Sequence, residues 1–211
     1  MEKILVIGAN GATGKHIVKI LSNIDRYHIK ALIRSEEQKE NFDCKAIEFY
    51  VGDLEKDFSK AFEEVDKVIF AAGSGGSTSD KKTIAVDQNG AKKAIDYAVE
   101  YQLKKFVMLS SMGTEHSDKV KGLEVYLKAK KEADDYLKNQ RIDYSILQPG
   151  TLTKYEAKHK IKKIKGVANG SVSREDVAYI LVKCLNQKIC NNKSFSFING
   201  TEPVDEVLSE I

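Results

Sequence analysis

The chain alternates short apolar runs with longer amphipathic segments. Short continuous apolar runs bounded by glycine, proline or charged residues are typical of strands buried on both faces. Segments whose apolar residues recur every three or four positions are typical of helices packed on one side. We expect strands at residues 3–7, 28–34, 45–51, 67–73, 105–109, 143–147 and 194–198, and helices at residues 15–21, 58–63, 80–101, 120–139 and 174–187, with a short helix after Pro203.

Alternating strands and helices predict an α/β fold with an open parallel sheet and helices on both faces. A chain of 211 residues has the size of one domain. We therefore expect a single three-layer α/β/α domain, in which residues 151–211 form a small C-terminal portion on the substrate side. Ligands of such sheets bind beyond the carboxyl ends of the strands, so residues at strand ends are the candidates for function.

The first expected strand leads directly into the glycine turn, Gly8-Ala9-Asn10-Gly11-Ala12-Thr13-Gly14, and then into a helical pattern. Strand, glycine turn and helix in succession are the context in which glycine spacing predicts a nucleotide site. Glycine permits torsions that a side chain opposes, and the helix start offers unpaired N–H groups to a pyrophosphate. The spacing G-x-x-G-x-x-G differs from the G-x-G-x-x-G of most dinucleotide enzymes. The alternative is a glycine-rich loop that holds no ligand.

Arg34 ends the second expected strand, about 20 residues after the last glycine of the turn. Proteins that bind NAD usually carry Asp or Glu here, whereas an Arg can accommodate the 2′-phosphate of NADP. The nearest acid is Glu36, and Ser35 could add a hydroxyl contact. The pattern favours NADP over NAD. The alternative is an ordinary surface Arg at the end of a strand.

Composition narrows the classes of partner. A net charge of +3 is too small to indicate nucleic acid or a membrane surface. Cys44, Cys184 and Cys190 lack metal-ligand spacing, and their odd number does not indicate a disulfide framework, so we expect free thiols in a reducing compartment and no metal. No apolar run approaches the roughly 20 residues that span a bilayer, and the N-terminal run is interpreted as a strand rather than a signal peptide. These features predict a soluble cytoplasmic protein.

The chain resembles the atypical branch of the short-chain dehydrogenase/reductase superfamily, which includes NAD(P)-binding, nitrogen-regulator-like, flavin-reductase-like and putative epimerase proteins. The motifs that carry the resemblance cover nearly the whole chain: the glycine turn, Arg34, Gly52-Asp53-Leu54, Ala71-Ala72-Gly73, Val86-Asp87, Ser110-Ser111, Tyr126-Leu127-Lys128-Ala129-Lys130, and residues 143–150 and 173–178. The resemblance implies a Rossmann fold with a doubly wound parallel sheet.

The same resemblance implies roles for residues around the cofactor. Asp53 and Leu54 would meet the adenine. The segment Ala71-Ala72-Gly73 would line the path of the ribose and pyrophosphate. The nicotinamide would be flanked by Pro149, Gly150 and Leu152 at the end of the sixth strand. Further cofactor contacts would come from Ser110, after the fifth strand, and from Lys130 of a helix.

Asp87 stands where many relatives carry an Asn that orders a proton-relay water. We count it among the catalytic candidates, although a carboxylate cannot donate and accept as an amide can, which puts the usual relay in doubt. The alternative is a helix carboxylate satisfied by local backbone.

Tyr126 and Lys130 form the candidate catalytic pair. They lie one helical turn apart and therefore share a face of the expected helix. A nearby ammonium favours the phenolate and lowers the pKa of a Tyr from about 10 toward neutrality, so that Tyr126 could give a proton to a carbonyl oxygen as hydride arrives at carbon. Ser111 would bond the same oxygen, with Ser110 in its place if the register differs by one. The alternative is a Tyr that packs the helix onto the sheet beside a solvated Lys.

Four further features are weaker. His16, His116 and His159 have no partner that the sequence identifies. The basic run at residues 158–165 could bind an anionic substrate or nucleic acid. A half-buried strand or hairpin is the favoured interpretation, because no aromatic stacking platform accompanies it.

We therefore expect an NADP-dependent oxidoreductase that transfers a hydride between the nicotinamide and a small carbonyl, quinone or flavin-like substrate. Its partner would be a small molecule rather than nucleic acid or membrane, and it would be a monomer or a homodimer. The other interpretation is an NADP-binding redox sensor or regulator without turnover. Residues 151–211 leave little material for the substrate domain of a nucleotide-sugar epimerase, so we rank such a substrate low.

Overall fold

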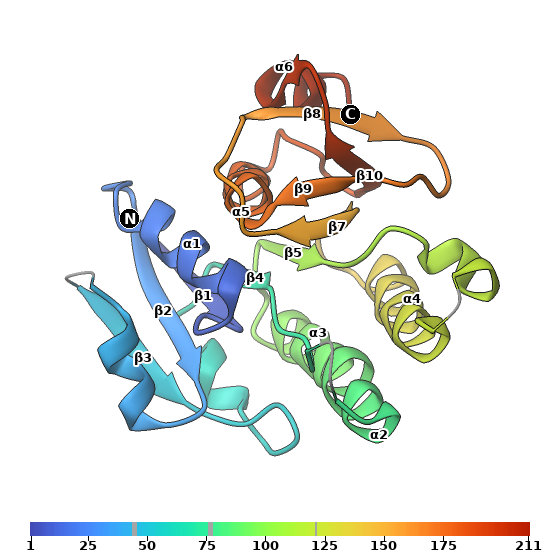
Figure 1. The fold of residues 1–211 in the computed structure, drawn as a ribbon. Helices are drawn as coiled ribbons and strands as arrows, with labels where there is room; N and C mark the ends of the chain where they lie inside the picture. Colours follow the sequence, from blue (N-terminus) through green and yellow to red (C-terminus); the bar gives the residue numbers. More distant parts are fainter. Residues whose placement is uncertain (44–45, 76–77, 121) are drawn as a thin grey trace.

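The computed structural model describes residues 1–43, 46–75, 78–120 and 122–211 (Figure 1). Within these residues nine strands form one sheet, in the order β11-β8-β10-β6-β5-β4-β1-β2-β3. The strands of this sheet are β1 (Glu2–Ile7), β2 (Tyr27–Ile33), β3 (Ile47–Val51), β4 (Lys67–Phe70), β5 (Lys105–Leu109), β6 (Tyr144–Pro149), β8 (Lys160–Ile164), β10 (Lys193–Asn199) and β11 (Glu202–Pro203). Two further strands, β7 (Thr151–Thr153) and β9 (Ser171–Ser173), pair with each other in a separate sheet. The helices are α1 (Ala12–Leu21), α2 (Asp80–Thr83), α3 (Ala91–Glu100), α4 (Glu124–Lys138), α5 (Arg174–Lys183) and α6 (Val204–Ser209).

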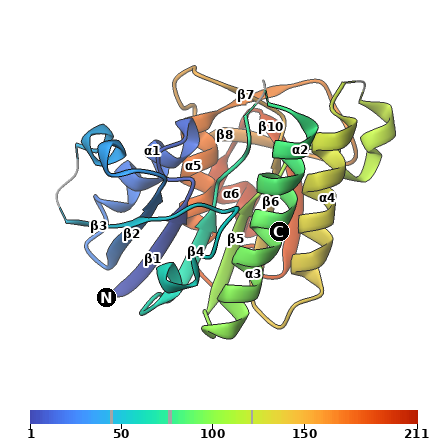
Figure 2. The same ribbon diagram turned by 90° about the horizontal axis from the view of Figure 1, so that it is seen from below.

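The strand order places the first strand, β1, inside the sheet, third from one edge. β1 pairs in parallel with both β2 and β4, so the chain leaves β1 in one direction through β2 and β3 and in the other through β4, β5 and β6. Figure 2 shows α1 and α5 on one side of the sheet, and α3 and α4 on the other. The doubly wound α/β prediction is confirmed. In such a fold the crevice beyond β1 and β4 is the expected ligand site.

The buried strands pack on both faces because successive side chains point to opposite sides. In β1, Ile4 and Val6 join the core beneath α1 and α5, whereas Leu5 and Ile7 join the core beneath α3. All four residues are fully buried. This explains why the sequence shows continuous apolar runs rather than alternation.

The C-terminal part of the sheet is more complex than predicted. β10 pairs in parallel with β6, but β8 runs antiparallel to β10 and β11 antiparallel to β8, so the sheet is mostly rather than wholly parallel. β8 contains most of the basic run and confirms its interpretation as a half-buried strand, with Ile161 buried and Lys162 exposed. The parallel pair β7 and β9 was not predicted, because three-residue strands are too short to show a period.

Helix boundaries differ from the prediction at several places. The helix expected at residues 80–101 consists of α2, a π-helical segment (Ile84–Gly90) and α3. The helix expected from residue 120 begins only at Glu124, after Gly122 at a φ of +80°. Cys44 and the first residue of the strand expected at 45–51 lie outside the described residues. In the part of the chain that the structure describes, no helix has the length and apolar composition needed to cross a membrane.

Candidate functional site

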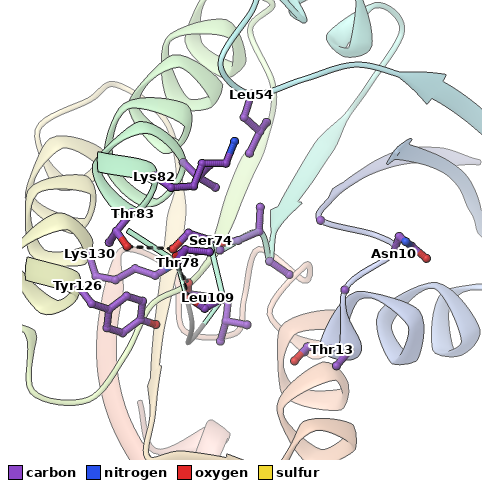
Figure 3. A pocket seen from close by; sticks show the side chains of 18 of the residues that line it. Asn10, Thr13, Leu54, Ser74, Thr78, Lys82, Thr83, Leu109, Tyr126 and Lys130 are labelled. Carbon is purple, nitrogen blue, oxygen red and sulfur yellow. Dashed lines mark hydrogen bonds between the residues drawn. The ribbon is translucent and has the colours of Figure 1, made fainter. Parts of the chain in front are cut away.

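A cavity of about 760 Å³ lies at the carboxyl ends of β1, β2, β4 and β5. Figure 3 shows Asn10 and Thr13 of the glycine turn on one side of it, and Tyr126 and Lys130 of α4 on the other. The tertiary structure brings together most of the residues predicted for the site. Those that line the cavity are Gly8, Asn10, Gly11, Ala12, Thr13, Arg34, Asp53, Leu54, Ala71, Ala72, Gly73, Ser110, Tyr126, Lys130 and Leu152.

Steric limits explain two glycines of the turn. Gly8 has a φ of +84°, and a Cβ there would lie 2.6 Å from the backbone nitrogen of Ala72. Glycine is required because the ends of β1 and β4 approach each other closely. A Cβ on Gly14 would lie 2.1 Å from the carbonyl oxygen of Gly8, so Gly14 lets α1 pack directly on the turn. Gly14 therefore acts in packing rather than at the cavity surface.

The start of α1 fits a polyanionic ligand. Gly11 is the N-cap, and no side chain caps the helix. Gly11, Ala12 and Thr13 line the cavity. The side-chain oxygen of Asn10 is buried and has no hydrogen-bond partner among the described residues. Uncapped helix N–H groups and an orphaned buried oxygen are polar groups that a ligand would satisfy.

Arg34 lies immediately after β2, where its exposed side chain borders the cavity. Its backbone N–H donates to the Oε1 of Gln38 at 2.9 Å, which fixes the start of the following loop. Glu36, the nearest acid along the chain, pairs with Lys39. Across the described ranges no carboxylate forms an ion pair with Arg34, so its guanidinium is open to an anion in the cavity.

Lys130 and Asp87 form a buried ion pair beneath the cavity. Lys130 Nζ lies 3.0 Å from Asp87 Oδ1, and the side chains are 4% and 0% exposed. Asp87 Oδ2 accepts a hydrogen bond from the backbone N–H of Ser74 at 2.8 Å. Lys130 Nζ also donates to the carbonyl oxygens of Leu109 and Ala72, at 3.3 and 3.4 Å. The partners of Asp87 therefore come from outside its own helix, and the alternative of a carboxylate satisfied by local backbone is wrong.

This environment keeps Lys130 charged. Burial by itself would lower the pKa of Lys130, but the neighbouring Tyr126 and Asp87, together with the hydrogen bond to Asp87, outweigh burial and raise it. The three protons of the ammonium are matched by three protein acceptors. Lys130 thus joins the ends of β4 and β5 to the π-helical segment that carries Asp87.

Tyr126 reaches the cavity from the first turn of α4. Its side chain is half-buried, and in Figure 3 the phenol points away from the helix toward Leu109. The ammonium of Lys130 lies 5.8 Å from the centre of its ring. The expected pair therefore shares one face of the helix, with the ammonium over the ring rather than at the hydroxyl.

Ser110, and not Ser111, lines the cavity. The Oγ of Ser111 instead donates to the carbonyl oxygen of Met112 at 3.3 Å. The expectation that Ser111 faces the site is corrected in favour of Ser110, the residue named for a register shifted by one. The physical reason is that consecutive side chains at the end of β5 point to opposite sides.

The side chain beneath Ser110 is Asp134, which the sequence analysis did not single out. Ser110 Oγ donates to Asp134 Oδ2 at 2.7 Å, and Gln148 Nε2 donates to the same oxygen at 3.1 Å. Burial raises the pKa of Asp134 to about 6, against the opposing effect of the hydrogen bonds from Ser110 and Gln148. The signal was present, because Asp134 falls on the buried face of α4 with Leu127.

Comparison with known proteins places these features in a family. The family model for NAD(P)H-binding proteins matches residues 8–188. The chain belongs to the NAD(P)H-binding family. Its motifs identify it with the atypical branch of the short-chain dehydrogenases/reductases, as the sequence resemblance implied.

The chain is also similar to three known proteins with different names. An uncharacterized sugar epimerase, YhfK, of Bacillus subtilis is 33% identical over 99% of this chain and 100% of its own length. The structure of a putative NAD-dependent epimerase/dehydratase from Bacillus halodurans is 35% identical, with a TM-score of 0.92 and full coverage of both chains. Sanguinarine reductase of Eschscholzia californica is 26% identical over 98% of this chain and 92% of its own length.

Other residues predicted for the nucleotide-binding site lie outside the cavity lining. Pro149 belongs to β6. Gly150 packs against the next segment, since a Cβ there would lie 2.6 Å from the carbonyl oxygen of Gly170. Of the three residues at or just after the end of β6 that were expected to flank the nicotinamide, Pro149, Gly150 and Leu152, only Leu152 lines the cavity.

The weaker histidine candidates do not line the cavity either. The backbone N–H of His159 donates to Asp176 Oδ1 at 2.8 Å, and its ring packs edge-on against Tyr179. His159 therefore serves to attach the strand β8 to the start of α5. For His16 and His116 the structure provides no functional partner among the described residues.

The structure adds residues to the nucleotide site that sequence reasoning missed. Ser74 and Thr83 share a hydrogen bond of 3.2 Å at the cavity wall, and Lys82 pairs with Glu55 beside them. Arg174 follows Ser173 in a motif that carried the family resemblance without an assigned role. The additional lining residues include Gln38, Ser74, Thr78, Lys82, Thr83, Val86, Leu109, Leu123, Val125 and Arg174.

Proposed function

We propose that this protein is an NADP-dependent oxidoreductase that transfers a hydride between the nicotinamide and a small carbonyl, quinone or flavin-like substrate. One observation carries the proposal: a single cavity is lined by the glycine turn, by Arg34, and by Tyr126 with Lys130. The first two provide for a phosphorylated dinucleotide, and the third provides a proton donor. Membership of the NAD(P)H-binding family supports the cofactor class.

In this proposal the residues that line the cavity between β2 and α4 would hold the cofactor. The uncapped start of α1 would bind the pyrophosphate, and Arg34 would bind the 2′-phosphate of the adenosine. Asp53 and Leu54 would contact the adenine, and the segment Ala71-Ala72-Gly73 would contact the ribose. When bound, the nicotinamide supplies the hydride.

The residues of α4 and β5 manage the proton. The Tyr126 hydroxyl gives a proton to the substrate oxygen in reduction and takes it back in oxidation. Lys130 provides a fixed positive charge next to that phenol. Its protons face Asp87 and two carbonyl oxygens, so we assign it an electrostatic and positioning role rather than a hydrogen bond to ribose. Ser110 takes the place first expected for Ser111 at the substrate oxygen.

The apolar side chains of the cavity favour an acceptor with apolar surface. Leu109, Leu123, Val125 and Leu152 line the cavity, and Leu123 is 47% exposed at its edge. An exposed leucine at a cavity edge gains free energy when an apolar ligand covers it. The similarity to sanguinarine reductase supports a reductase activity. The relatives with epimerase names share the cofactor fold. The residues after β7 here form β8, β10 and β11 of the large sheet, the short strand β9, and the helices α5 and α6.

The first test is calorimetric titration with NADPH and with NADH. We expect NADPH to bind more tightly, and Arg34→Ala to weaken NADPH binding by about tenfold or more while leaving NADH binding unchanged, because a charged hydrogen bond is worth about 1.5–3 kcal/mol. Arg26→Ala is the matched control, since Arg26 is an exposed arginine that precedes β2, at the opposite end of that strand. Binding of neither nucleotide would overturn the proposal.

The second test follows consumption of NADPH with naphthoquinone, an aromatic aldehyde and a free flavin as acceptors. Oxidation of NADPH by any of them supports the reductase. We also propose a cytoplasmic setting, in keeping with the free buried thiols of Cys184 and Cys190, and a monomer or homodimer, which sedimentation of the purified protein measures.

A further inference from the structure

Asp134 is a buried carboxylate that the mechanism above does not use. It is 1% exposed, and its Oδ2 accepts the hydrogen bonds from Ser110 and Gln148. Its Oδ1 is buried and has no hydrogen-bond partner in the described part of the chain. An ionised carboxylate with one oxygen unsatisfied is costly to bury, so protonation is within reach.

The amide of Gln148 is held in one orientation. Its Nε2 donates to Thr114 Oγ1 at 2.9 Å and to Asp134 Oδ2, while its Oε1 accepts from Ser196 Oγ at 3.1 Å. Gln148 therefore presents a donor to Asp134 at all times. Of these two donor residues, Ser110 lines the cavity and Gln148 does not, so Ser110 lies between Asp134 and the space that a substrate would occupy.

The charged groups around Asp134 leave its carboxylate without a direct cation. On its own helix, Lys130 is paired with Asp87, and Lys138 with Asp135 at 3.3 Å. Ser110 of the segment after β5, Gln148 of β6 and Thr114 present uncharged side chains to Asp134. The other elements packed against α4 carry titratable groups with partners of their own or at a distance from Asp134: Asp87 pairs with Lys130, Glu115 pairs with Lys131, and His116 follows Glu115. Burial accordingly dominates and raises the pKa of Asp134 to about 6.

A serine hydroxyl has one proton, and Asp134 decides where that proton points. When Asp134 is ionised, Ser110 donates to it and has only lone pairs left for the cavity. When Asp134 is protonated, its own O–H can donate to Ser110 Oγ, and the Ser110 proton is released toward the cavity. The same hydroxyl is therefore an acceptor in the first state and a donor in the second.

We propose that Asp134 is a positioning residue whose protonation sets Ser110 as donor to a carbonyl oxygen, and whose ionisation sets Ser110 as acceptor from an alcohol. This inference rests on the proposed function, because it places the substrate oxygen beside Ser110. No substrate bond forms or breaks at Asp134, and its proton exchanges with solvent. The expected consequence is that carbonyl ligands bind better in acid and alcohol ligands bind better near neutrality.

The first experiment titrates the Asp134 carboxyl directly by carbon-13 NMR of aspartate-labelled protein, with Asp134→Asn to assign the signal. We expect a midpoint near 6, and a higher midpoint in Ser110→Ala, which removes a donor to the ionised form. A midpoint at the ordinary value of about 4 would overturn the inference. This measurement needs no substrate and no turnover.

The second experiment measures ligand affinity against pH with a matched pair of probes, naphthaldehyde with NADP⁺ and naphthylmethanol with NADPH. Neither combination can react. As the pH rises through about two units around the Asp134 midpoint, we expect the affinity for the aldehyde to fall and the affinity for the alcohol to rise, each by about threefold to tenfold. This is the worth of one hydrogen bond. Asp134→Asn should make both profiles flat, whereas the surface control Asp135→Asn should keep them.

Gln148→Arg is a second variant, which favours the ionised form of Asp134, whereas Asp134→Asn leaves an uncharged side chain. A permanently charged guanidinium beside Asp134 would keep it ionised and hold Ser110 as an acceptor throughout the range. Equal pH profiles in the wild type and Asp134→Asn would overturn the inference. Failure to bind either nucleotide would overturn the proposed function instead, while the carboxyl titration would still decide the coupling of Asp134 to Ser110.

Discussion

Lys130 on α4 and Asp87 in the π-helical segment meet 3.0 Å apart in a site where both side chains are almost fully buried. The pair connects the helix that carries Tyr126 to the loop that begins at Ser74, through the hydrogen bond from the Ser74 N–H. Because π-helical insertions are frequent at functional sites, the position of Asp87 is consistent with a support beneath the reacting groups.

Breaking this pair should destabilise the fold strongly. Asp87→Asn leaves a buried ammonium without its carboxylate, and we expect a loss of about 3–5 kcal/mol in the free energy of unfolding, measured with urea. Asp135→Asn removes a surface partner of Lys131 and should cost less than about 1 kcal/mol. Equal effects of the two substitutions would show that the buried pair is not an important support.

Tyr126→Phe should separate an enzyme from a cofactor sensor. The substitution removes only the hydroxyl, so we expect NADPH affinity to change by less than about twofold and the rate of NADPH oxidation to fall by about a hundredfold or more. The rate is measured with an acceptor identified by the screen. Tyr97→Phe is the matched control, since the Tyr97 hydroxyl makes an exposed hydrogen bond to Asp57 and Tyr97 does not line the cavity. An unchanged rate in Tyr126→Phe would remove the assigned proton donor.

Gly8→Ala should lose both stability and cofactor binding. The new Cβ would lie 2.6 Å from the backbone nitrogen of Ala72, which follows β4, and residue 8 has a φ of +84°. Gly166→Ala has a similar φ of +77° but open space around the Cβ, so it isolates the cost of backbone strain, about 1 kcal/mol. We expect Gly8→Ala to cost at least about 2 kcal/mol more than the control in urea unfolding, from overpacking.

Asp134 should make stability depend on pH in an unusual direction. Its folded-state pKa of about 6 lies above the ordinary value of 3.8, so between these values the folded protein binds more protons than the unfolded chain, and stability falls as pH rises. Relative to Asp134→Asn, the wild type should lose about 2–3 kcal/mol between about pH 4 and pH 7. Urea unfolding of both proteins at several pH values measures this effect. A wild type that gains stability relative to Asp134→Asn as the pH rises would contradict it.

Local patterns predicted the strands and the ligand-binding edge of the sheet well. β5 has the predicted bounds, and the turn from Gly8 to Gly14 lies between β1 and α1 as expected. The pattern could not distinguish Ser110 from Ser111, because the choice depends on which side of the sheet the chain leaves β5. It also could not show that Gly150 packs against Gly170, a contact between distant segments.

The sequence by itself determined the alternation of elements, the doubly wound α/β fold and the cofactor class, because these depend on periodicity and on glycine at fixed local spacing. Only the tertiary structure decided which polar groups share one environment. It paired Lys130 with Asp87, placed Asp134 beneath Ser110, and added Arg174 to the cavity. Such contacts depend on distance and burial between segments far apart in the chain, and these quantities have no signature in a local pattern.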